Sequence, residues 1–219
     1  MNQANLIRAV EQAIGLLRAD YRGQAAESDL YEASLLALAV EAARTAGGTC
    51  LLTSDGRTSA KELVFRRGPG NLWLGIFTYA LATFPNVAKC LEIHLGVYVL
   101  CPSGVAHECD VAILDHAEAE RSRNAAVHPR RKGLVTAIEA KNYAASPGLG
   151  IGRAFLGLAS ELGHKNCKLA FPAASSANIA ALIAKRDSEI FDELIPGTAA
   201  AERLRSHLDQ KIRNWRASS

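Results

Sequence analysis

The segment 134–143, with the sequence LVTAIEAKNY, constrains the fold more than any other part of this chain. It begins as an apolar run typical of a buried β-strand, yet it carries Glu139 and Lys141 two residues apart. Burying an ion is costly unless the ion is paired or bound to a metal. Glu139 and Lys141 therefore require partners or a bound ion, and other segments of the sequence must provide them.

The hydrophobic pattern predicts an α/β protein with a mixed central sheet flanked by helices. Ser28 is the predicted N-cap of the second helix, the region 49–84 is irregular apart from a short strand in ELVF, and the C-terminal helix is expected at the surface. One domain is expected, with a core at 28–185 and helical extensions at 1–27 and 186–219. The predicted order is helices 4–21 and 28–48, strands 92–101, 105–115 and 134–143, helix 152–163, strand 167–172, and helices 175–186 and 198–216.

Composition and cysteine usage predict a soluble, cytoplasmic protein. Nearly half of the 219 residues are apolar (49%), and the formal net charge of +3 permits a nucleic-acid partner without requiring one. The five cysteines form no CxxC pair, and the N-terminal sequence lacks the layout of an export signal, so reduced thiols are expected. No apolar run is long enough to span a bilayer, so no membrane partner is expected.

Side-chain alternation predicts a cluster of acids beside a lysine. In 105–115, Glu108 and Asp110 share one face of the expected strand, and in 134–143 Glu139 and Lys141 share one face. If the two faces coincide, these side chains converge. Neighbouring carboxylates repel unless a cation lies between them, and Mg²⁺ prefers oxygen ligands. A lysine nearby could orient a water molecule or stabilise charge on a phosphate.

The pieces HECDVAIL and AIEAK, within an α-β-β-β-α-β order, resemble the PD-(D/E)xK or restriction-endonuclease-like nuclease superfamily. The resemblance implies a restriction-endonuclease-like core in which Asp110 and Glu139 bind the metal, with the Ala140 carbonyl as a further ligand, and Lys141 is the catalytic lysine. Many members add a glutamate from the preceding helix. Glu32 is preferred over Glu41 because it shares a helix face with apolar residues, and Glu108 is either a further ligand or a neighbour.

Basic residues suggest DNA as the partner. Five of them separate the two acidic strands, and two more lie in FRRGPG; beside a metal site they could neutralise phosphates, although an exposed loop is the simpler interpretation. The resulting hypothesis is a DNA endonuclease dependent on Mg²⁺, with Mn²⁺ as a substitute, acting in restriction, phage defence or repair, and homodimeric to match duplex symmetry. The predicted phosphate contacts are Arg66, Arg67, Arg121, Arg123, Arg130, Arg131 and Lys132.

Other interpretations stay open or are disfavoured. A non-cleaving DNA-binding or assembly module with a nuclease-like fold is the main alternative, and a structural subunit with a charged edge strand is another. The glycines of GLGIGR are interpreted as a bend before a helix rather than as a phosphate loop. Zinc is disfavoured because no pair has the spacing of a structural zinc site, and the cysteines are interpreted as core residues. The residues considered for zinc are His94, Cys101, His107, Cys109 and His116.

Overall fold

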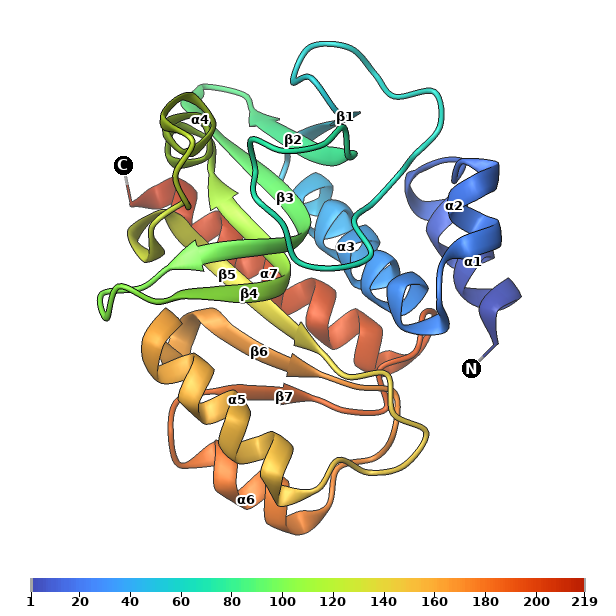
Figure 1. The fold of residues 1–219 in the computed structure, drawn as a ribbon. Coiled ribbons are helices and arrows are strands. Elements are labelled where there is room, and N and C mark those ends of the chain that lie inside the picture. The colour runs from blue at the N-terminus through green and yellow to red at the C-terminus, as the bar shows by residue number, and fades with distance from the viewer. Residues whose placement is uncertain (1, 219) are drawn as a thin grey trace.

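The computed structural model describes residues 2–218 and has seven strands in one mixed sheet, in the order β1-β2-β3-β4-β5-β6-β7 (Figure 1). The strands are β1 (Thr49–Thr53), β2 (Tyr79–Phe84), β3 (Val87–Leu100), β4 (Ala106–Asp115), β5 (Leu134–Ala140), β6 (Cys167–Ala170) and β7 (Glu189–Phe191). The helices are α1 (Gln3–Ile14), α2 (Ala19–Gln24), α3 (Glu27–Thr45), α4 (His116–Ala125), α5 (Leu149–Leu162), α6 (Ala177–Ala184) and α7 (Ala199–Ala217).

The sheet changes from antiparallel to parallel at β5. Strands β1 to β5 form an antiparallel meander, whereas β6 and β7 pair in parallel with their neighbours. A parallel neighbour requires the chain to cross back along the sheet, and α5 and α6 make these two crossings. The carboxyl ends of β5, β6 and β7 therefore lie at one edge of the sheet (Figure 1).

Helices cover both faces of the sheet and define two apolar clusters. The first cluster joins one face to α1, α3 and α7, and the second joins the other face to α5 and α6. Helix α3 buries residues around most of its circumference because it lies between α1, α7 and the sheet. Among residues 2–218, no helix is long and apolar enough to cross a lipid bilayer.

The predicted α/β class and the order of the core elements agree with the structure, but several local predictions were wrong. Strands β1, β2 and β7 were missed, and ELVF is no strand: only Leu63 makes an isolated bridge, with Leu17. Helix α3 begins before Ser28, and Asp29 accepts the N–H of Ala26 at 2.8 Å. The expected surface helix α7 buries one side against α3, with Leu204, Leu208 and Ile212 in the core.

The predicted alternation along β4 fails at Asp110. Cys109 belongs to the second apolar cluster and Val111 to the first, although both have the same parity. The switch coincides with Gly96 in the partner strand β3, which stands between Leu95 and Val97, the partners of Val111 and Cys109, and has φ of 56°. A side chain there would strain the backbone, and its Cβ would lie 2.8 Å from the Gly68 carbonyl oxygen. Glycine thus permits the close approach of the Gly68 backbone to β3 at this position.

Candidate active site at the end of strand β5

Asp110 lies where β4 and β5 stop pairing. The regular ladder between the two strands ends at Val111 and Ile138, one position before Asp110 and Glu139 would face each other. The Ala140 N–H, which further pairing would direct at the β4 backbone, instead donates to Asp110 Oδ2 at 2.6 Å. The carboxylate therefore substitutes for a ladder partner and sits in the plane of the sheet between diverging strands.

Lys141 joins the two acids that the sequence predicted to converge. Its Nζ lies 2.6 Å from Glu139 Oε1 and 4.0 Å from Asp110 Oδ2. The Lys141 N–H donates to the Ala170 carbonyl at 2.9 Å, so β6 holds this residue beyond the end of β5. Burial would lower the pKa of Lys141, but the two carboxylates outweigh that effect and raise it, so the side chain is a cation.

Two further glutamates add negative charge at the same place. Burial, followed by the charge of Asp110, raises the pKa of Glu32 on α3 to about 8. Burial and the charge of Glu139 likewise raise the pKa of Asp110 to about 7 and that of Glu108 above its usual value. Glu41, the alternative from α3, lines a separate cavity with α1 residues. The structure thus gathers Glu32 and Glu108, and not Glu41, around Asp110.

This donor set suits a hard divalent cation. Four carboxylates act on one another here, and Lys141 is the cation that neutralises part of their charge. Carboxylate oxygens are the ligands that Mg²⁺ prefers, and a bound cation would offset both the burial and the mutual repulsion that raise the pKa values of Glu32 and Asp110. The Lys141 ammonium lies between Glu139 and Asp110. Within residues 2–218, the oxygens of these acids do not form a group of three potential ligand atoms that lie within 4.8 Å of one another. Binding a metal would require Lys141 and the acids to rearrange.

A cavity lies at the carboxyl ends of the parallel strands β5 and β6. It has a volume of about 260 Å³, and its walls include Asn142 and Tyr143 after β5 and Pro172 after β6. Crevices outside the carboxyl ends of parallel strands are the usual ligand sites of open α/β sheets. Asn142, which lines this cavity, directly follows Lys141 in the chain.

The arginines predicted to bind phosphate mostly hold other parts of the protein together. Arg121 and Arg130 both bind the buried Glu118, at 2.6 and 2.7 Å. Arg123 forms ion pairs with the buried Glu92 and with the exposed Glu120. These guanidinium groups donate hydrogen bonds to carboxylates of the same chain. The prediction that these arginines lie in an exposed basic loop is therefore wrong. Helix α4 replaces that loop.

The remaining basic residues are dispersed. Arg66 donates to the Asn71 and Leu74 carbonyls at 2.7 Å each, and Arg67 donates to the Gln24 carbonyl at 3.2 Å. Arg131 lies beside the end of α5. Lys132 is exposed and lines a cavity of about 680 Å³ together with Arg121 and Arg130.

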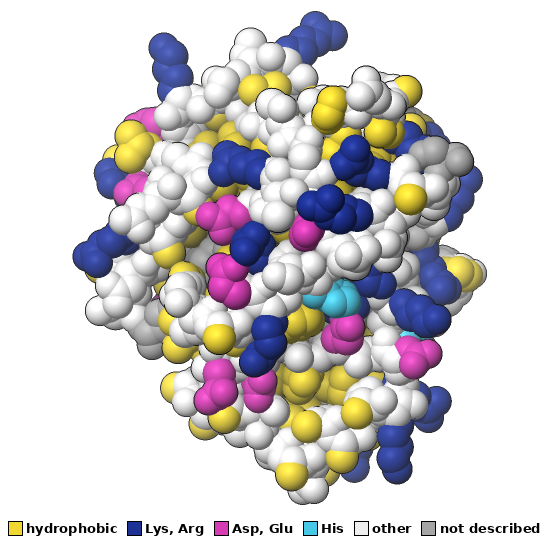
Figure 2. Space-filling model, turned by 180° about the vertical axis from the view of Figure 1, so that it is seen from behind, with side chains coloured by type: hydrophobic (Ala, Val, Ile, Leu, Met, Phe, Trp, Pro, Cys, Tyr) yellow, Lys and Arg dark blue, Asp and Glu magenta, His cyan; other side chains and the backbone are white. Residues whose placement is uncertain are grey.

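The cavity lined by Lys132, Arg121 and Arg130 lies at the opposite end of β5 from Glu139 and Lys141. It borders the start of β5 at Leu134 and Val135, whereas Glu139 and Lys141 are at the other end of the strand, about 20 Å away at roughly 3.3 Å per residue. The prediction that the basic segment flanks the metal site is therefore wrong. Figure 2, which shows the molecule from behind, has Lys and Arg side chains spread over the surface with Asp and Glu side chains among them.

The histidines and cysteines considered for zinc separate into different environments. His94 and His116 contact Glu92 at 2.7 and 2.6 Å, within the ion-pair network of Arg123. Cys109 is buried in the second apolar cluster, as expected for a core residue. Cys101 and His107 instead come together with Glu161, a residue that the sequence did not single out.

Comparisons of this chain with protein-family models, curated proteins and solved structures found no match. The function is therefore inferred from the residues and their geometry. The feature that decides the inference is the gathering of Glu32, Asp110, Glu139 and Lys141 at the point where β4 leaves β5.

Proposed function

We propose that this protein is a Mg²⁺-dependent nuclease of restriction-endonuclease-like fold that hydrolyses DNA phosphodiester bonds. The observation that carries the proposal is the position of Lys141 between Glu139 and Asp110, with Glu32 close enough that the charge of Asp110, after burial, raises the pKa of Glu32. The helix, three antiparallel strands, crossover helix and parallel strand that present these residues support the fold assignment.

Each residue has a proposed role that follows from its position. Asp110 and Glu139 would hold the metal, with the Ala140 carbonyl and Glu32 as further oxygen ligands and Glu108 next to them. Bound there, Mg²⁺ would supply a Lewis acid for the phosphoryl group. Released from its ion pair with Glu139, Lys141 would orient the attacking water or stabilise charge on the phosphate. The Ala140 N–H fixes the Asp110 carboxylate from the side of β5.

The substrate would approach the carboxyl edge of β5 and β6 rather than the basic cavity at the opposite end. The long segment between β1 and β2 packs against β3 near the level of Asp110, because the Gly70 N–H donates to the Gly96 carbonyl at 2.8 Å and the neighbours of Gly96 pair with Val111 and Cys109. Arg67, which is exposed in the same segment, is the predicted cation best placed to contact a phosphate. A homodimer on duplex DNA stays a prediction.

The test is cleavage of supercoiled plasmid with Mg²⁺ or Mn²⁺ by the wild type and by variants of the same shape. Asp110→Asn and Lys141→Met should each lower the cleavage rate at least about 100-fold, a typical cost of removing one preorganised catalytic group. Glu120→Gln is the matched control, because Glu120 is an exposed acid on α4 and should leave the rate unchanged.

Two outcomes would count against the proposal. If Lys141→Met and Asp110→Asn cut as fast as the wild type, the acids and lysine are not the active site. If the wild type binds DNA but cuts no faster than Lys141→Met, with single-stranded and duplex substrates both tried, the non-cleaving binding module is the better description.

A further inference from the structure

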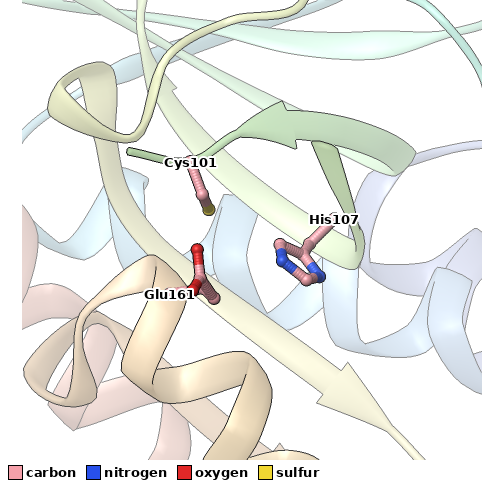
Figure 3. A group of neighbouring side chains, drawn as sticks. All are labelled: Cys101, His107 and Glu161. Atoms are coloured by element: carbon pink, nitrogen blue, oxygen red, sulfur yellow. The ribbon is translucent and has the colours of Figure 1, made fainter. Parts of the chain in front are cut away.

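A second group of potential metal ligands lies near the turn between β3 and β4 and shares no residue with the proposed nuclease site. Cys101 follows the last residue of β3, His107 is the second residue of β4, and Glu161 is near the end of α5. One ligand atom from each lies within 4.8 Å of the other two. Figure 3 shows the thiol, the imidazole and the carboxylate converging from three separate elements.

We propose that Cys101, His107 and Glu161 bind one Zn²⁺ ion. A thiolate, an imidazole and a carboxylate are all established zinc ligands, and the thiolate disfavours the hard ions Mg²⁺ and Ca²⁺. Zinc bonds of about 2.0 to 2.3 Å in a tetrahedron place ligand atoms about 3.3 to 3.8 Å apart. The three ligand atoms thus need to move closer to one another by only about 1 Å. Rotation about the side-chain bonds can provide this movement.

The backbone fixes the positions of the first two ligands. Val99 pairs with His107 across the β3–β4 hairpin, and Cys101 begins the connecting turn. In that turn the Cys101 N–H donates to the Val105 carbonyl and the Gly104 N–H donates to the Cys101 carbonyl, both at 2.9 Å. The thiol is therefore held on the side of the hairpin that faces α5, and its residue is only 4% exposed.

The side chains around the ligands are arranged as they are around metal sites. Ser103 Oγ donates to Glu161 Oε2 at 2.6 Å, which orients the carboxylate and leaves Oε1 free to bind. Within residues 2–218, neither ring nitrogen of His107 has a hydrogen bond to the protein, so either nitrogen can act as a ligand. Hydrogen bonds to ligating carboxylates are a common feature of protein metal sites.

The other group of three, formed by Glu92, His116 and Glu120, is a weaker candidate. Arg123 already binds both oxygens of Glu92 as well as Glu120. A metal ion would have to displace a guanidinium that is held by two carboxylates. Among residues 2–218, no Lys or Arg forms an ion pair with Glu161. A metal bound by the three ligands would link the β3–β4 hairpin to α5.

Zinc binding can be measured by equilibrium dialysis in excess Mg²⁺, which saturates the acids around Asp110. The wild type should bind one Zn²⁺ per chain. Cys101→Ser, His107→Ala and Glu161→Gln should each lower the affinity at least tenfold, and Ser103→Ala should lower it about 10-fold to 100-fold. Cys90→Ser, a cysteine outside the group, and Asp110→Asn are the controls and should keep the wild-type affinity.

Cobalt provides a spectroscopic sign of a thiolate ligand that the wild type alone can show. With Co²⁺ in place of Zn²⁺, the wild type should show a near-ultraviolet thiolate-to-cobalt charge-transfer band that Cys101→Ser lacks. No zinc uptake by the wild type, no charge-transfer band, or an unchanged affinity in Cys101→Ser would each overturn the proposal. Loss of zinc binding in Asp110→Asn would also overturn it, because the ion would then belong to the other site.

Discussion

Replacement of Glu92 by glutamine tests whether the arginines of α4 serve the fold or bind a partner. The Glu92 side chain has no exposed surface, and it contacts His94 at 2.7 Å, His116 at 2.6 Å and Arg123. Burial would raise the pKa of Glu92, but hydrogen bonds from His116, His94 and Arg123 outweigh burial and hold the pKa below its usual range. The carboxylate is thus charged and paired inside the protein. Glu92→Gln keeps the size and removes the charge.

The expected cost follows from what remains after the substitution. Removing one partner of a buried ion pair costs about 3 to 5 kcal/mol, because the other charge is left without compensation. Arg123 keeps 21% and His116 keeps 34% of its side-chain surface exposed, so both can recover some hydration. The lower end, about 3 kcal/mol, is therefore expected. For a chain of this size, this lowers Tm by about 6 to 12 °C.

The assay is thermal and urea unfolding followed by circular dichroism, with Glu120→Gln as the control. Glu120 pairs with the same Arg123 at 2.7 Å, but its side chain is 48% exposed. An exposed pair contributes about 0 to 1 kcal/mol, so Glu120→Gln should change Tm little. If the two variants lower Tm equally, the buried network is not what holds α4 to β3. Arg123 would then be free to bind a partner such as DNA.

Two further predictions concern the acids and the glycine beside them. Gly96→Ala should destabilise the protein by more than about 1 kcal/mol, measured by urea unfolding, because Gly96 has φ of 56° and faces the Gly68 carbonyl; an unchanged midpoint would contradict the close approach. Mg²⁺ affinity, measured by calorimetry, should rise about tenfold or more from about pH 6 to about pH 8. The pKa of Asp110 is about 7 and that of Glu32 about 8, so protons leave these carboxyl groups across that range and only the carboxylates bind the ion. A flat profile would show that neither acid is a ligand.

The sequence was most informative where the pattern is local. Alternation along a strand placed Glu139 and Lys141 on one side, and the order of elements predicted an acid-bearing neighbour strand; their contacts in the structure agree with both. Helical spacing likewise favoured Glu32 over Glu41, and the charges that act on Glu32 support that choice. These inferences needed only the periods of helix and strand, which neighbouring residues determine.

Contacts between distant residues were decided by the tertiary structure. Arg123 is 31 residues from Glu92, and a basic residue in a sequence carries no sign of which acid it will meet. Cys109 and Val111 have the same parity but belong to different apolar clusters, and the change of face between them coincides with Gly96 in the neighbouring strand, which alternation along β4 alone does not reveal.

The proposed zinc site shows the same division. Cys101 and His107 lie close together in the sequence, but zinc was disfavoured because neither has a partner at the spacing of a zinc motif. Glu161 completes the group from α5, the helix of the crossover between β5 and β6, 54 residues after His107. From its sequence this chain is an α/β protein with acids and a lysine at a strand end. Which side chains meet across the sheet, and so where metals can bind, follows from packing that brings residues far apart in the chain within a few ångströms.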